Sequence, residues 1–90
     1  MEEFRAIVSG RVQMVMFRDF VTRKAWKVGV KGLVRNLEDG TVEVVAQGEK
    51  ENLEQLIAYL HEGSMLSHVE SVSVEWSIPQ KIFDSFELVY

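Results

Sequence analysis

The sequence predicts a single small domain of the α+β class, and three observations indicate this. The chain has 90 residues, of which 47% are hydrophobic and 27% are charged, a mixture typical of a folded globular protein. Its hydrophobic period switches along the chain between two, the period of a strand, and 3.6, the period of a helix. No linker, repeat or change of composition divides it, so we expect residues 1–90 to form one domain.

The N-terminal third predicts a strand, a loop and a helix. Alternation of Phe4, Ala6 and Val8 with their neighbours predicts a strand that ends near Gly10. Residues 11–16 follow neither period, so we expect a loop. Apolar residues then recur on one face of a helix that Gly29 can end; they are Phe17, Phe20, Val21, Ala25 and Val28.

The middle of the chain predicts a hairpin followed by a second helix. Residues 30–36 and 41–47 are predicted strands, and the Asp39-Gly40 pair between them is typical of a tight hairpin turn. Apolar residues then recur at i, i+3, i+4 and i+7 and predict a helix that Gly63 ends; they are Leu53, Leu56, Ile57 and Leu60.

Two further strands complete the chain. Val72, Val74 and Trp76 alternate with polar residues, and Phe86, Leu88 and Tyr90 alternate to the C-terminus as a short fifth strand. The order β-α-β-β-α-β is typical of the ferredoxin-like α/β sandwich, in which two helices cover one face of a mostly antiparallel sheet. Because this architecture carries many functions, the function must be argued from a site.

Composition excludes several classes of function. The chain has no cysteine, which excludes disulfides, thiolate metal sites and cysteine nucleophiles. Its 14 acidic and 10 basic residues give a net charge of −4, which argues against a nucleic-acid partner. No window approaches the roughly 18 apolar residues of a membrane span, and the N-terminus does not resemble a signal peptide. We therefore expect a cytoplasmic protein without a nucleic-acid or membrane partner. A monomer is also expected, although composition does not decide it.

A search for common catalytic groups removes further candidates. His61 and His68 have no partner at metal-ligand spacing, so we expect no metal and no cofactor. The serines include no Gly-x-Ser-x-Gly elbow, so an activated serine nucleophile is not expected. The acidic residues scatter as they do on a solvated face, which leaves no paired-carboxylate mechanism.

What remains is the loop that opens the first helix. Backbone N–H groups in a first helical turn lack internal partners and favour an anion such as phosphate. Arg18 lies in that turn and adds a planar cation that suits phosphate oxygens, although many arginines at such positions are simply solvated. Asn36, a polar residue that ends an apolar strand just before a hairpin, is more often a turn former or a satisfied edge residue than a catalytic group.

Two segments resemble the acylphosphatase family. Residues 10–18, Gly-Arg-Val-Gln-Met-Val-Met-Phe-Arg, closely resemble the family signature G-x-V-Q-G-V-x-F-R. Residues 29–36 and 39–43, followed by Gln47-Gly48, resemble the second block of the family at the usual distance. Length and element order agree as well, so the resemblance covers essentially the whole chain.

The resemblance implies a reaction and a site. It implies hydrolysis of an acyl phosphate to carboxylate and inorganic phosphate by a positioned water, with no metal, no cofactor and no covalent intermediate. Arg18 would bind the phosphate and Asn36 would hold the water. Inorganic phosphate, as a product, is expected to inhibit competitively. Main-chain N–H groups would cradle the phosphate; the residues implied are Gln13, Met14, Val15, Met16, Phe17 and Arg18.

One position departs from the family pattern. Met14 stands where the signature has a glycine, and a bulky residue with positive φ would cost roughly 1–2 kcal/mol. Three outcomes are open: the position does not require positive φ, strain is stored in the loop, or the loop is rearranged and activity falls. The alternative to an enzyme is therefore a weakly active or non-catalytic anion-binding module on the same scaffold. RNA binding on the open sheet face is a third and weaker alternative.

Overall fold

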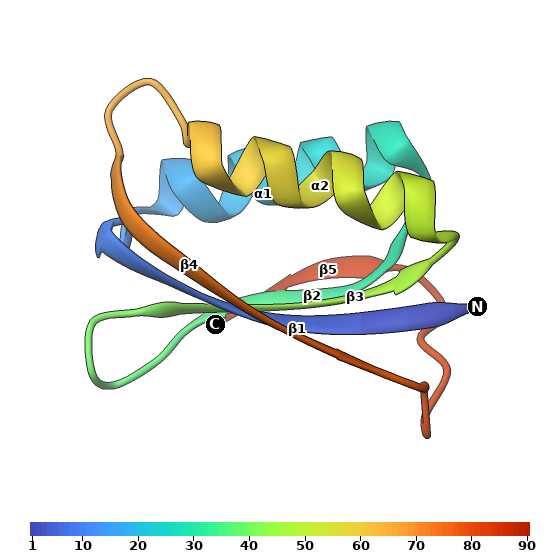
Figure 1. Ribbon diagram of the computed structural model, residues 1–90. Coiled ribbons are helices and arrows are strands. Elements are labelled where there is room, and N and C mark those ends of the chain that lie inside the picture. The colour runs from blue at the N-terminus through green and yellow to red at the C-terminus, as the bar shows by residue number, and fades with distance from the viewer.

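The computed structural model describes residues 1–90 apart from the side chain of Val15. Its order, β-α-β-β-α-β with a short last strand, is the predicted one (Figure 1). The last strand stops one residue earlier than expected, so Tyr90 lies beyond it. The elements are β1 (Glu2–Arg11), α1 (Val15–Val28), β2 (Lys31–Asn36), β3 (Val42–Gly48), α2 (Lys50–Glu62), β4 (His68–Ser77) and β5 (Phe86–Val89).

The strands form one mixed sheet with both helices on the same face. Its order is β4-β1-β3-β2-β5, and neighbouring strands are antiparallel except for β2 and β5, which are parallel. Figure 1 shows α1 and α2 side by side above the sheet. This is the predicted ferredoxin-like sandwich. Neither helix is long and apolar enough to cross a membrane.

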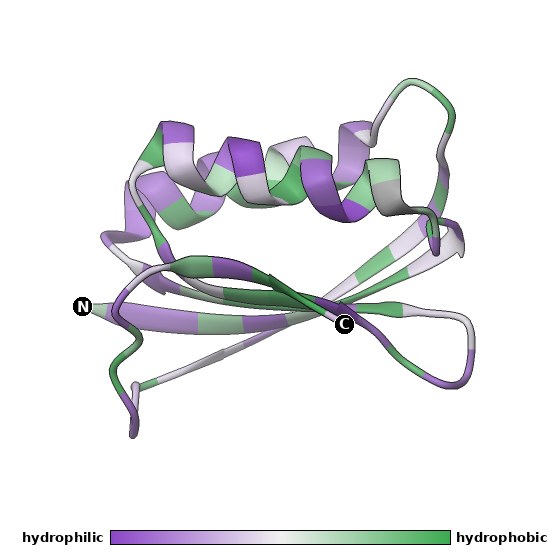
Figure 2. Cartoon of the chain, turned by 180° about the vertical axis from the view of Figure 1, so that it is seen from behind, coloured by the Kyte–Doolittle hydropathy of each residue, from purple (hydrophilic) through white to green (hydrophobic). Residues whose placement is uncertain are grey.

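The core lies between the helices and the sheet. Phe4, Ala6 and Val8 of β1 are fully buried, which confirms the predicted alternation of that strand. Both helices carry hydrophilic and hydrophobic residues along their length, as expected for helices that bury one face (Figure 2). Phe17 of α1 and Leu56 of α2 are completely buried, and burial of such a side chain contributes about 1.5–3 kcal/mol.

A bulge at Gly10 turns the end of β1 into the loop before α1. The pairing of β1 with β4 shifts register between Ser9 and Gly10, and Gly10 has a φ of 122°. A Cβ atom at this position would lie 2.1 Å from the carbonyl oxygen of His68. Only glycine fits both this φ and this approach of the two backbones.

The topology brings four chain segments to one end of the sheet. β1 and β2 both run antiparallel to β3, and β5 runs parallel to β2, so the C-terminal ends of all three lie together. α1 follows β1 and therefore begins at this end. Figure 1 shows the start of α1, the hairpin between β2 and β3 and the C-terminus on the same side of the molecule.

The sheet face opposite the helices carries a buried carboxylate between two arginines. Glu43 of β3 accepts a hydrogen bond from Arg5 Nε at 2.5 Å and one from Arg35 Nε at 2.6 Å. Burial alone would raise the pKa of Glu43, but the hydrogen bonds and charges of Arg35 and Arg5 outweigh it and lower that pKa. The sequence had suggested that the acidic residues lie on a solvated face. Glu43 is an exception, because its carboxylate is buried.

Candidate functional site

Arg18 is a buried cation held by the end of the chain. Arg18 is only 7% exposed, and its Nη1 donates a hydrogen bond to the carbonyl oxygen of Val89 at 3.1 Å. The ring of Tyr90 lies 5.0 Å from the guanidinium carbon. In the described part of the chain, the buried Nε has no hydrogen-bond partner and no carboxylate forms an ion pair with Arg18. Because a buried cation without an anion is costly, the geometry favours an anion beside Nε.

Asn36 is the last residue of β2 and lies at the same end of the sheet. Its neighbour Arg35 is the register partner of Val89, whose carbonyl oxygen binds Arg18. The buried Oδ1 of Asn36 has no hydrogen-bond donor among the residues described here. Arg18 therefore offers a donor without an acceptor and Asn36 an acceptor without a donor, at neighbouring points of the fold.

Gln13 ties the loop before α1 to the hairpin that follows Asn36. Its Nε2 donates to the carbonyl oxygens of Leu37 at 2.5 Å and Thr41 at 2.8 Å. Those two residues close the hairpin, because Leu37 N donates to Thr41 O at 2.9 Å. One side chain thus fixes the predicted phosphate loop against the residue next to Asn36.

Met14 occupies the glycine position of the signature without left-handed strain. It is the N-cap residue of α1, with φ −113° and ψ 148°, an extended conformation open to any residue. No residue other than glycine has positive φ in the part of the chain that is described. Of the three outcomes left open by the sequence, strain stored at Met14 is therefore wrong, and the other two stay predictions.

The remaining loop residues divide into different environments. Phe17 packs in the core, and the amides of Phe17 and Arg18 donate to the carbonyl oxygen of Met14 at 3.0 and 3.4 Å. These two amides therefore have an acceptor inside the helix, and their predicted part in a cradle for an anion stays a prediction. Met16 is 47% exposed on the outer side of α1. Val15 begins α1, and its side chain lies outside the described residues.

The structure adds two contributions that sequence reasoning missed. Val89 and Tyr90 hold the guanidinium of Arg18, although 71 positions separate Arg18 from Val89. The only sequence signal is the aromatic end of the last strand, which does not indicate a contact with α1. Within the described residues, no three histidine, aspartate or glutamate side chains are grouped so as to hold a metal ion.

Comparison with known proteins identifies the family. The Acylphosphatase family model matches residues 4–88. The acylphosphatase of Thermococcus kodakarensis is 46% identical over 82 residues, which cover 91% of this chain and 89% of that protein. The acylphosphatase of Bacillus licheniformis is 43% identical over 90 residues and the full length of both chains. The crystal structure of acylphosphatase from Bacillus subtilis superposes with a TM-score of 0.95, at 39% identity over all of both chains. On this agreement of sequence, length and fold, the chain belongs to the acylphosphatase family.

Proposed function

We propose that this chain hydrolyses acyl phosphates to a carboxylate and inorganic phosphate, with Arg18 binding the phosphate and Asn36 holding the attacking water. Membership of the family supports the reaction. The observation that supports the residue roles is the buried guanidinium of Arg18, whose Nε has no acceptor among the described residues. A phosphate oxygen is the acceptor that this planar donor suits best.

The phosphate is bound by the side chain of Arg18 together with main-chain amides at the start of α1. Because the amides of Phe17 and Arg18 donate to Met14 O, the proposed cradle relies mainly on the backbone of residues 13–16. Val89 O and the Tyr90 ring keep the guanidinium in place before the substrate arrives. Preorganised donors of this kind stabilise the charge that develops on the equatorial oxygens.

Asn36 orients the water. Its Oδ1 accepts a hydrogen bond from the water, which places the water oxygen in line with the bond between phosphorus and the acyl oxygen. The new bond between phosphorus and the water oxygen forms as the bond between phosphorus and the acyl oxygen breaks. The carboxylate leaves with the electron pair of the broken bond. The phosphate itself takes the proton of the water. A carboxylate is a good leaving group, so positioning and charge stabilisation supply most of the rate enhancement.

The test is phosphate release from benzoyl phosphate in the presence of a chelator. Arg18→Ala and Asn36→Ala are compared with the native chain and with two matched controls, Arg23→Ala and Asn52→Ala. We expect kcat/KM to fall about 10²–10³-fold in the first two and to stay near native in the controls. Circular dichroism checks that each variant is folded.

Two results would contradict the proposal. Hydrolysis retained in folded Arg18→Ala or Asn36→Ala would remove the assigned roles. Phosphate binding by a native chain that does not hydrolyse benzoyl phosphate would favour the non-catalytic anion-binding module. Competitive inhibition by inorganic phosphate, a monomeric state and a cytoplasmic location stay predictions, and the first is measured in the same assay.

A further inference from the structure

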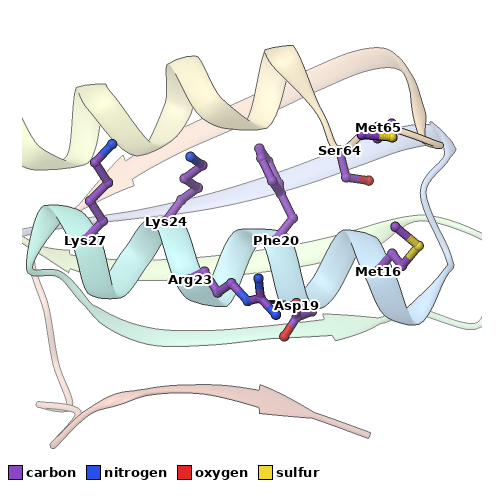
Figure 3. A pocket seen from close by; sticks show the side chains of 8 residues that line it. All are labelled: Met16, Asp19, Phe20, Arg23, Lys24, Lys27, Ser64 and Met65. Atoms are coloured by element: carbon purple, nitrogen blue, oxygen red, sulfur yellow. Dashed lines mark ion pairs between the residues drawn. The ribbon is translucent and has the colours of Figure 1, made fainter.

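A groove on the outer side of the helix layer has no part in the proposed reaction. Its volume is about 540 Å³, and it lies between α1 and the connection from α2 to β4. Figure 3 shows Phe20, Lys24 and Lys27 rising from α1 toward α2, with Met65 above the start of α1. Neither Arg18 nor Asn36 lines this groove.

The groove is basic in an acidic protein. Arg23, Lys24 and Lys27 line it and Asp19 is its one acidic residue, whereas the whole chain carries a net charge of −4. Arg23 pairs with Asp19 at 3.0 Å, but their side chains are 72% and 49% exposed. An exposed pair of this kind is weak, so Arg23 is free to exchange Asp19 for a carboxylate of a ligand.

Aromatic rings hold the two lysines in place. Lys24 Nζ lies 4.5 Å from the centroid of the Tyr59 ring and 5.6 Å from that of Phe20. Lys27 Nζ lies 5.7 Å from the Tyr59 centroid and donates to the Tyr59 hydroxyl at 3.3 Å. Both ammonium groups are therefore ordered before a ligand binds, which lowers the entropic cost of binding.

The rest of the lining is apolar and adaptable. Met16 and Met65 are 47% and 91% exposed, and Phe20 lies between the methionines and the lysines along α1. Methionine side chains adapt to apolar partners of different shape. From Met16 to Lys27, α1 extends about 16 Å, the length of about three helical turns. An apolar end followed by a row of cations over this length suits a peptide better than a single phosphate or carboxylate.

We propose that this groove binds an acidic segment of a partner protein that carries apolar side chains at one end. Carboxylates of the segment pair with Arg23, Lys24 and Lys27, and its apolar side chains cover Phe20 and the two methionines. The complementarity of charge between a local basic groove and an acidic segment sets the choice of partner. This site meets the proposed phosphate cradle at Met16, whose side chain lines the groove while its backbone belongs to the cradle. Peptide binding there does not depend on hydrolysis.

The test uses a labelled model peptide and the full chain. The peptide has about 12 residues, with leucines in one half and glutamates in the other, and its counterpart has lysine in place of each glutamate. We expect saturable binding of the acidic peptide by fluorescence anisotropy, and about tenfold weaker binding in the double variant Lys24→Glu/Lys27→Glu. Met65→Ser, at a highly exposed position, is expected to weaken binding without affecting the fold.

The controls distinguish peptide binding in the groove from a general effect of net charge and from an effect on catalysis. Lys31→Glu changes the charge of an exposed residue at the start of β2 and should leave peptide binding unchanged. All groove variants should hydrolyse benzoyl phosphate at the native rate. Equal binding of both peptides, native affinity in the double variant, or equal loss in Lys31→Glu would overturn the proposal. So would displacement of the peptide by ATP at the same site, or self-association of the chain that the double variant abolishes.

Discussion

Replacement of Gln13 by alanine tests whether the two halves of the site are held together by one side chain. In the native chain, the Gln13 amide donates to Leu37 O at 2.5 Å and to Thr41 O at 2.8 Å. A hydrogen bond contributes about 0.5–1.5 kcal/mol, and these bonds are exposed, so their loss should lower the free energy of unfolding by about 1–2 kcal/mol. The loop before α1 is then no longer fixed against the hairpin.

The larger effect is expected on catalysis. Asn36 immediately precedes Leu37, so loss of the two bonds lets the proposed water-holding group move relative to the phosphate loop. A displacement of about 1 Å between reacting groups costs up to about 100-fold in rate. We expect kcat for benzoyl phosphate to fall about 10- to 100-fold, while the inhibition constant for inorganic phosphate changes little, because Arg18 keeps its contact with Val89.

Steady-state kinetics and urea unfolding of the same variants measure both effects. Gln80→Ala, an exposed glutamine in the connection before β5, is the matched control and should behave as native. Gln13→Glu keeps the size of the side chain but places a carboxylate against two carbonyl oxygens, so it should be worse than alanine at neutral pH. Native kcat in Gln13→Ala, whatever its stability, would refute the positioning role.

Three further predictions concern the fold around the site. Gly10→Ala places a methyl group against the backbone and should lower stability by about 2–3 kcal/mol, measured by urea unfolding; Gly40→Ala, which meets no atom within 4 Å among the described residues, should cost about 1 kcal/mol. The pKa of Glu43 is lowered in the folded state, so its ionised carboxylate stabilises the fold above the ordinary pKa of about 4.3. This contribution to stability is lost as the pH falls through the pKa of the folded state. Unfolding measured between about pH 3 and 6 should therefore depend less on pH in Glu43→Gln, and equal slopes would contradict this. Met14→Gly should leave kcat/KM within about twofold of native, because Met14 is unstrained; a clear rise would mean that the methionine is a defect.

Regular elements were predictable from the sequence because their signals are local. The alternation of Phe4, Ala6 and Val8 and the Asp39-Gly40 turn each depend on neighbours in the chain, and each appears where expected. In this element order, the strand pairing brings the start of the first helix and the end of the second strand to one end of the sheet. Arg18 and the neighbourhood of Asn36 were therefore within reach of sequence reasoning.

Contacts that depend on strand register were not predictable. Glu43 meets Arg5 because β1 and β3 pair in one particular register, in which Arg5 stands opposite Val45 and not opposite Glu43 itself. Arg18 meets Val89 only because β5 adds to the edge of the sheet beside β2. A shift of either register by one residue would turn the side chains to the other face, and no local pattern fixes it.

The two buried charged side chains among the described residues, Glu43 and Arg18, differ in a way that separates structure from function. Glu43 has a perturbed pKa, a property often associated with active sites, but both of its carboxylate oxygens accept hydrogen bonds from arginines. Its charge is fully compensated, so it holds strands together and has no need of a ligand. Arg18 shows no such pairing among the described residues, because its Nε is buried and lacks an acceptor. A fold tolerates that cost where binding restores the missing partner, so the unsatisfied donor, and not the perturbed pKa, supports the proposal that this chain binds its substrate at Arg18.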